Sequence, residues 1–209
     1  MFQSNHSFGS RLRGFFCAAT VAAAVTLISG CANYYVDTAL KDMQPEQVQK
    51  VANPKPVQLL FEFQTKGTAN ARATDALKQQ VTDLTTKSGM FSQVSAAPVE
   101  NHAVLNITIN NVPMTDDAFA KGFVSGLTLG LAGNTVTDGY VCTINYLPGN
   151  GSEKVTKTVR HAIHTTVGAK SAPANAVESP SVQSAVETML RQIVLNGLND
   201  LATDPAFKK

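Results

Sequence analysis

Histidine and acidic side chains are the groups in this 209-residue sequence that could bind a metal or transfer protons. His161 and His164 lie three residues apart in a segment with the pattern of a strand. Their side chains are therefore expected on opposite faces, where they cannot hold one metal together. Asp116 and Asp117 are adjacent and typical of a solvated turn. We expect no metal site and no cofactor.

Motifs of catalysis are missing from the sequence as well. It has no Gly-x-Ser-x-Gly, no phosphate-binding loop and no His-Glu-x-x-His. A catalytic triad can be assembled from distant residues, so a hydrolase stays open as an alternative to a non-catalytic protein. The formal net charge is +2 without a run of basic residues, which argues against nucleic acid as a partner.

The first thirty residues have the pattern of a secretory signal. Residues 1–14 are polar and include Arg11 and Arg13, and residues 15–27 carry no charge. A basic start followed by an apolar stretch of this length indicates a signal peptide. The stretch is shorter than the about 20 residues that a membrane-spanning helix needs.

The next four residues, Ile28-Ser29-Gly30-Cys31, resemble the lipobox of bacterial lipoproteins. The resemblance implies cleavage between Gly30 and Cys31, a diacylglycerol on the Cys31 sulfur, and a fatty acid such as palmitate on the new amine. Ala32 is not the aspartate that retains lipoproteins in the inner membrane. The resemblance therefore implies the outer membrane as a partner, with the protein on its periplasmic face. An ordinary cleaved signal with a stray cysteine is the alternative.

Processing changes the charge and the cysteine content. Removing residues 1–30 takes away two of the 17 basic residues and none of the 15 acidic ones, so the mature chain has no formal net charge. Cys142 is then the one cysteine besides Cys31, and no internal disulfide is expected. Cys142 lies in an alternating strand pattern, which predicts a buried and inert thiol.

Three parts of the chain follow from these patterns. Residues 1–30 are the lipoprotein signal peptide, and 31–56 are a lipidated N-terminus and linker with a short helix around 46–52. Residues 57–209 are a single periplasmic α+β domain, long enough for one hydrophobic core.

Within that domain, hydrophobic periodicity predicts four main strands and two helices. The expected elements are strands over 57–63, 103–112, 139–147 and 155–167, a helix from an Asn70 cap to Gly89, and a helix opened by Ser179-Pro180 and closed by Asp204-Pro205. The last helix is expected to bury Val182, Val186, Met189, Ile193 and Leu198 or Leu201. The fold class is α+β, a small mixed sheet of about four strands with two helices packed on one face, in the order β-α-β-β-β-α.

The end of the first helix, Ser88-Gly89-Met90-Phe91-Ser92-Gln93-Val94, resembles a recurring bacterial envelope domain. It is similar to the anticodon-binding-like domain of LpoB activators, the TolB N-terminal domain and the CsgG lipoproteins, over about residues 57–112. The resemblance implies binding to other envelope proteins or assembly into rings, and it assigns no functional residue.

One apolar segment, Ala118–Gly133, contains a single charge. Gly122, Gly126 and Gly130 recur every fourth residue and would form one smooth helix face, with Phe123 and Leu127 beside it. As a helix the segment would rise roughly 24 Å, short of the roughly 30 Å hydrocarbon core. It is consistent with a buried connection, a membrane-surface element or a self-association interface.

These observations favour a lipid-anchored, non-catalytic interaction module of the bacterial envelope that binds or regulates another envelope protein, or itself. Residues 118–133 are the candidate interaction segment. An oligomeric pore or export component that uses this segment is the first alternative, and an envelope hydrolase is the second.

Overall fold

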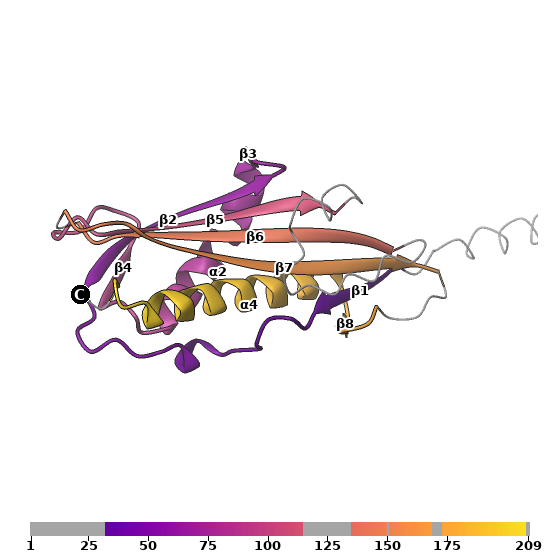
Figure 1. The fold of residues 1–209 in the computed structure, drawn as a ribbon. Coiled ribbons are helices and arrows are strands. Elements are labelled where there is room, and N and C mark those ends of the chain that lie inside the picture. The colour runs from indigo at the N-terminus through magenta and orange to yellow at the C-terminus, as the bar shows by residue number, and fades with distance from the viewer. Residues whose placement is uncertain (1–31, 115–134, 150, 169–172, 208–209) are drawn as a thin grey trace, which may run out of the picture. The chain divides into compact units, whose positions relative to one another are not determined.

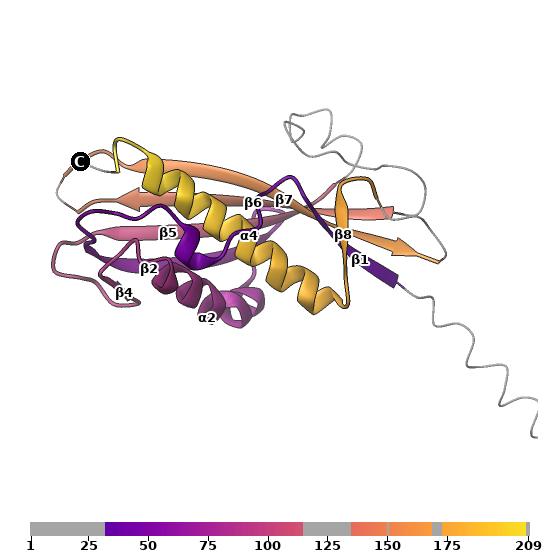
Figure 2. The same cartoon turned by 90° about the horizontal axis from the view of Figure 1, so that it is seen from below.

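The computed structural model describes residues 32–114, 135–149, 151–168 and 173–207. They form one mixed sheet of eight strands with the helices on one of its faces (Figures 1 and 2). The α+β class is therefore confirmed. The predicted number of about four strands is too low, because the additional strands are short pieces with little periodicity.

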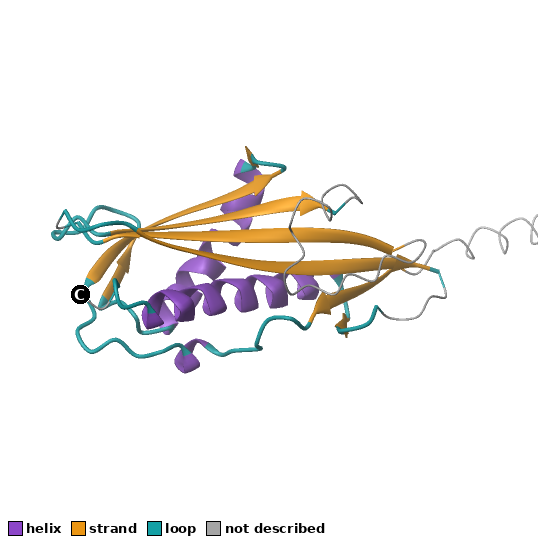
Figure 3. Cartoon of the chain, in the orientation of Figure 1, coloured by secondary structure: helices purple, strands orange, loops and turns teal. Residues whose placement is uncertain are grey.

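The elements are shown by type in Figure 3. The strands are β1 (Ala32–Asp37), β2 (Pro56–Thr65), β3 (Thr68–Ala69), β4 (Gln93–Ser95), β5 (Val104–Pro113), β6 (Thr135–Leu147), β7 (Val155–Val167) and β8 (Ala176–Ser179). The helical elements are the 3-10 helix η1 (Pro45–Gln47), α2 (Ala71–Lys87) and α4 (Val182–Thr203). The strand order is β3-β2-β5-β6-β7-β1-β8, with β4 paired to β2. β2 runs parallel to β4 and β5, and the other pairs are antiparallel.

The beginning of the expected linker, residues 32–37, forms strand β1 instead. Ala32 pairs with Val167 of β7, and Tyr34 pairs with Ser179 of β8. The sequence Ala-Asn-Tyr-Tyr-Val-Asp does not alternate between apolar and polar residues, so it carries no strand signal of period two. Hydrogen bonding to a neighbour on each side holds this segment in the sheet.

The rest of the expected linker packs along the helices. The helix predicted around 46–52 is only the three-residue η1, and the chain then continues in extended form. The Asn196 side chain donates to the Lys41 carbonyl at 2.8 Å, and the Asn199 side chain accepts from the Gln49 amide at 3.1 Å. Figure 1 shows this segment running beside α4. Residues 38–55 therefore brace the domain.

Helix α2 begins and ends where the sequence indicates. The Asn70 side chain accepts from the Ala73 amide at 3.1 Å and caps the first turn. The helix ends at Lys87, and Gly89 follows with a φ of +68°, a left-handed conformation that glycine adopts without strain.

The start of helix α4 differs from the prediction. Ser179 is the last residue of β8, and the N-cap is Ser181, whose side chain accepts from the Ser184 amide at 3.1 Å. Val182 is therefore exposed at the first helical position, before the helix reaches the sheet. The C-terminal end at Asp204 is as predicted.

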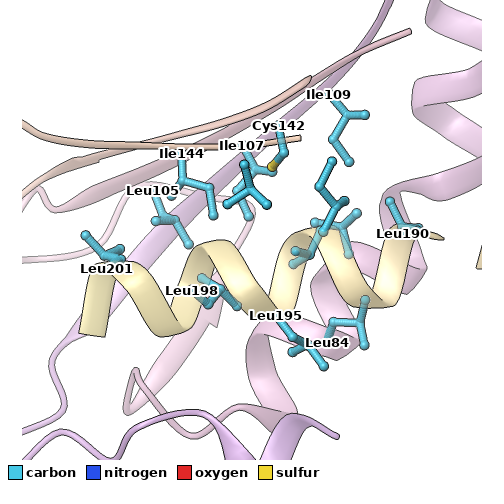
Figure 4. Close-up of a cluster of buried hydrophobic side chains, with 14 of the residues drawn as sticks. Leu84, Leu105, Ile107, Ile109, Cys142, Ile144, Leu190, Leu195, Leu198 and Leu201 are labelled. Atoms are coloured by element: carbon cyan, nitrogen blue, oxygen red, sulfur yellow. The ribbon is translucent and has the colours of Figure 1, made fainter. Parts of the chain in front are cut away.

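The hydrophobic core lies between α4, α2 and the inner face of the sheet (Figure 4). Leu105, Ile107, Ile109, Cys142 and Ile144 point from β5 and β6 toward the leucines of α4. A Cβ atom on Gly197 would lie 2.7 Å from Ile144 Cδ1, so this glycine lets α4 approach β6 closely.

Candidate functional site

The residues that the sequence analysis assigned to lipidation and to the interaction segment fall outside the part of the chain that the structure describes. They are Gly30 and Cys31 at the predicted cleavage and lipidation site, and Gly122, Phe123, Gly126, Leu127 and Gly130 in the predicted interaction segment. The structure does describe the neighbouring residues, where the chain enters the sheet after Cys31 and where it leaves and re-enters the sheet around residues 115–134.

Four strand termini meet at one end of the sheet. Pro113, at the end of β5, pairs with Asp138 of β6, whereas Thr135, at the start of β6, pairs with Thr166 of β7. β7 ends opposite Ala32, the residue that follows Cys31. We call this end, with the start of β1, the anchor end (right side of Figure 1). Both flanks of residues 115–134 therefore leave the sheet at the end where β1 begins.

A buried hydroxyl, imidazole and carboxylate lie near the anchor end. Thr137 Oγ1 is 2.9 Å from His164 Nδ1, and His164 Nε2 is 3.6 Å from Asp37 Oδ2. This order of groups is that of a hydrolase triad. However, the distance to Asp37 exceeds that of a hydrogen bond. All three residues are at most 2% exposed, which leaves Thr137 without access to a substrate. The Thr137–His164 contact joins β6 to β7, and Asp37 of β1 lies beside it.

His161 belongs to a different network on the helix-covered face. Its Nε2 lies 2.6 Å from Gln192 Oε1 of α4, and Gln192 Nε2 donates to Asp42 at 3.3 Å. Burial lowers the pKa of His161, whereas a hydrogen bond from Arg191 lowers the pKa of Asp42. His161 and His164 thus point to opposite faces, as predicted from strand alternation.

Two further sequence expectations concern Cys142 and metals. Cys142 is fully buried, and burial raises the pKa of its thiol to about 12, which fits the predicted inert thiol. Among the described residues, no three His, Cys, Asp or Glu side chains cluster closely enough to hold a metal ion. The described helices include none with the length and apolarity needed to cross a membrane.

An acidic cavity of about 460 Å³ lies between β1, β8 and the first half of α4. Asp37, Asp42 and Glu178 line it. Asp42 is paired with Arg191, and among the described residues no three acidic, histidine or cysteine side chains come close enough to hold a metal ion. The cavity therefore does not form a concentrated cation site.

A groove of about 310 Å³ lies at the opposite end of the sheet. Its apolar floor is formed by three aromatic rings, in which Tyr146 is 4.8 Å from Phe207 and 6.0 Å from Phe91 between ring centroids. The edge-on Phe91 and Phe207 rings complete the cluster at 6.1 Å. We call this feature, with its rim, the distal groove.

Two lysines line the distal groove. Lys50 and Lys55 come from the extended chain before β2, and both are exposed. Lys50 donates to the Ser88 carbonyl at 3.4 Å, which holds its ammonium group beside the opening. An apolar floor below two positive charges suits an apolar side chain next to a carboxylate. The volume suits a short peptide segment better than a large cofactor.

Comparisons with known proteins leave the family open. No family model matches the chain, and no curated protein matches it. Among solved structures, a dodecameric PelC variant from Paraburkholderia phytofirmans is 18% identical, with a TM-score of 0.35 over 81% of this chain and 97% of that one. A homolog of the neuraminyllactose-binding hemagglutinin from Helicobacter pylori is 11% identical, with a TM-score of 0.42 over 80% of this chain and 93% of that one. These scores are too low to support a conclusion about this chain.

Sequence reasoning did not identify the distal groove. Its aromatic residues are separated by more than fifty positions each, in the turn after α2, at the end of β6 and after α4. Each one reads as an ordinary core residue in its own segment. Only the bulky Met90-Phe91 after Gly89 gave a local signal, and it indicated a strand entry, not a groove.

Proposed function

We propose that the protein is a lipoprotein of the bacterial outer membrane, held by acyl chains on Cys31 at the periplasmic face, that binds another envelope protein through the distal groove. The observation that carries the proposal is the placement of the two features. The lipobox cysteine precedes β1 at one end of the sheet, and the groove lies at the other. β6, with 13 residues, connects the two ends and spans about 40 Å.

Bracing of the chain after β1 supports this function. Residues 38–55 contact α4 and then supply Lys50 and Lys55 to the groove. Residues 38–55 thereby connect the groove to β1, the strand that follows Cys31, through packed structure. An acylated Cys31 would hold the protein stably if two or more chains insert, at about 0.8 kcal/mol per buried CH₂.

The anchor is tested by comparing the full precursor with Cys31→Ser in a Gram-negative host. We expect the wild-type protein in the outer-membrane fraction, with a mass that includes acyl chains and lacks residues 1–30. Cys31→Ser should be released with the soluble periplasmic proteins. A wild-type protein of unacylated mass would overturn the anchoring.

The groove is tested with a photo-crosslinking residue at Ala206, which lines it. We expect an adduct of one defined mass in cells, and its loss on Lys55→Glu because the variant places a negative charge beside the partner's carboxylate. Lys78→Glu, an exposed lysine on α2, is the matched control and should keep the adduct. An adduct that survives Lys55→Glu would contradict binding through the groove.

A second candidate function, an oligomeric pore or export component, is favoured by the two flanks of residues 115–134 at the anchor end. It requires residues 118–133 to meet the bilayer beside the lipid. Detergent-dependent oligomers and conductance across planar bilayers are the expected results. A lipidated protein that stays monomeric and gives no conductance would exclude this function.

A further inference from the structure

The sheet extends beyond the helices at the anchor end. Helix α4 begins at Val182, beside β8, and covers the inner face of β6, β7 and β1 from there toward the distal end (Figure 2). Beyond its first turn, the strands continue with the same alternation. Within the described part of the chain, no helix covers the inner-face residues of these strand ends.

The register shows which side chains share this uncovered part of the inner face. Thr165 of β7 lies between Val136 of β6 and Tyr34 of β1. In the next row, Val167 lies opposite Ala32. On the other side of Tyr34, Val177 of β8 pairs with Val36, whose side chain is in the core. Directly opposite and diagonal residues on one face are within side-chain reach.

Five apolar residues share this face around Thr165, and we call them the valine strip: Ala32, Tyr34, Val136, Val167 and Val177. Val136, Val167 and Val177 are 59%, 50% and 62% exposed, and the other two are partly exposed. Single exposed apolar residues are ordinary, but a cluster on one face is typical of a binding surface. None of the five carries a charge.

The covalent link between Ala32 and Cys31 indicates the partner for this surface if Cys31 is acylated as proposed. Ala32 is itself a member of the strip, and consecutive Cα atoms are only about 3.8 Å apart. Acyl chains on Cys31 would therefore enter the bilayer within one residue of the strip. Because β1 is hydrogen-bonded on both sides, the strip cannot move away from the anchor as a flexible linker would.

We infer that the valine strip lies in the outer membrane surface, at the level of the lipid headgroups, and sets the sheet end-on to the bilayer. The inference rests on the proposed acylation of Cys31. Because the strip is uncharged, its binding does not depend on anionic lipids. The distal groove is then held about 40 Å from the membrane, at the far end of β6, where it is open to periplasmic proteins.

The test uses the mature, lipidated protein in vesicles of phosphatidylethanolamine and phosphatidylglycerol. An environment-sensitive thiol dye is attached to Val167→Cys in the strip, or to the matched control Leu147→Cys. Leu147 is 42% exposed and lies at the other end of β6. Cys142 is buried with a raised pKa and stays unlabelled, and the Cys31 sulfur is blocked as a thioether.

We expect doxyl-labelled lipids to quench the dye at position 167 several-fold more than the dye at position 147. Equal, low quenching at both positions would overturn the inference. Stronger quenching at position 147 would overturn it as well, because the distal end of the sheet would then be the end at the membrane. Shielding of the 167 dye from iodide without vesicles, in Cys31→Ser protein, would show that protein covers the strip, and this too would overturn it.

These outcomes are distinguishable from failure of the proposed function. The mass of the purified protein and its flotation with vesicles report on acylation before any dye is read. If the protein is acylated and floats, yet the dye at position 167 is not quenched, the proposed anchor stands and the inferred orientation is wrong. If the protein carries no acyl chains, both the proposed anchor and the inferred orientation are wrong.

Discussion

The two ends of the sheet differ in how far their apolar side chains are exposed. At the distal end, three aromatic side chains close the core against one another, and Phe91 and Tyr146 are less than a tenth exposed. At the anchor end, the inner face continues past α4 and leaves valines half exposed. An apolar surface that the fold completes itself stabilises the domain, whereas one that the fold leaves open is available to an external partner. The contrast separates an end where buried aromatic side chains pack on one another from an end where valine side chains are left half exposed.

The largest expected effect is on stability, from truncating an apolar side chain at each end. Phe91→Ala should lower the free energy of unfolding by about 3 to 4 kcal/mol, because it removes a buried ring with two aromatic neighbours. Val167→Ala should change it by less than about 0.5 kcal/mol, since the side chain is half exposed. Urea unfolding measures both. A Val167→Ala cost equal to that of Phe91→Ala would remove the distinction between the ends.

Two glycines extend the comparison to the backbone. Gly149 and Gly168 follow β6 and β7 at opposite ends, with φ values of +78° and +83°. A Cβ on Gly149 would lie 1.9 Å from the Asn101 carbonyl oxygen, whereas one on Gly168 would meet nothing within 4 Å. Gly149→Ala should therefore destabilise by about 3 kcal/mol and Gly168→Ala by about 1 kcal/mol. Thermal unfolding of the pair checks this, and equal costs would contradict the tighter packing at the distal turn.

Buried His161 predicts a pH dependence of stability. Burial lowers the pKa of His161, so the unfolded chain takes up this proton more readily than the folded one. Above about pH 6.5, His161 therefore does not reduce the free energy of unfolding. Below that pH, the free energy of unfolding falls by at most about 1.4 kcal/mol per pH unit. Denaturant midpoints between pH 5 and 8 measure the effect. His161→Gln, which can still bond Gln192, should reduce the slope, and an unchanged slope would assign it to another group.

The smallest expected effect concerns membrane binding without the lipid. In a Cys31→Ser background, Val167→Asp should weaken partitioning into neutral vesicles about fivefold, or roughly 1 kcal/mol. Leu147→Asp, at the distal end of β6, should leave partitioning unchanged. Flotation over a series of lipid concentrations gives both values. A larger loss with Leu147→Asp would reverse the assignment of the ends.

The sequence analysis succeeded where one segment contains all the information. Helix α2 was predicted from its cap at Asn70 to the glycine after it, and β7 was predicted residue for residue as 155–167. It failed where a neighbour decides the structure. Residues 32–37 show no alternation, and the paired strands β7 and β8 make them β1. The N-cap of α4 is Ser181 and not the predicted Ser179, because Ser179 is the last residue of strand β8.

The chain by itself determined the α+β class, the long strands, both long helices and the buried Cys142, because period and capping chemistry act within a few residues. Cys31 stays a prediction from its local motif. Only the tertiary structure decided which side chains meet. The Thr137–His164–Asp37 cluster, the distal groove and the valine strip each join segments far apart in sequence. Strand register sets those meetings, and register leaves no pattern in a single segment.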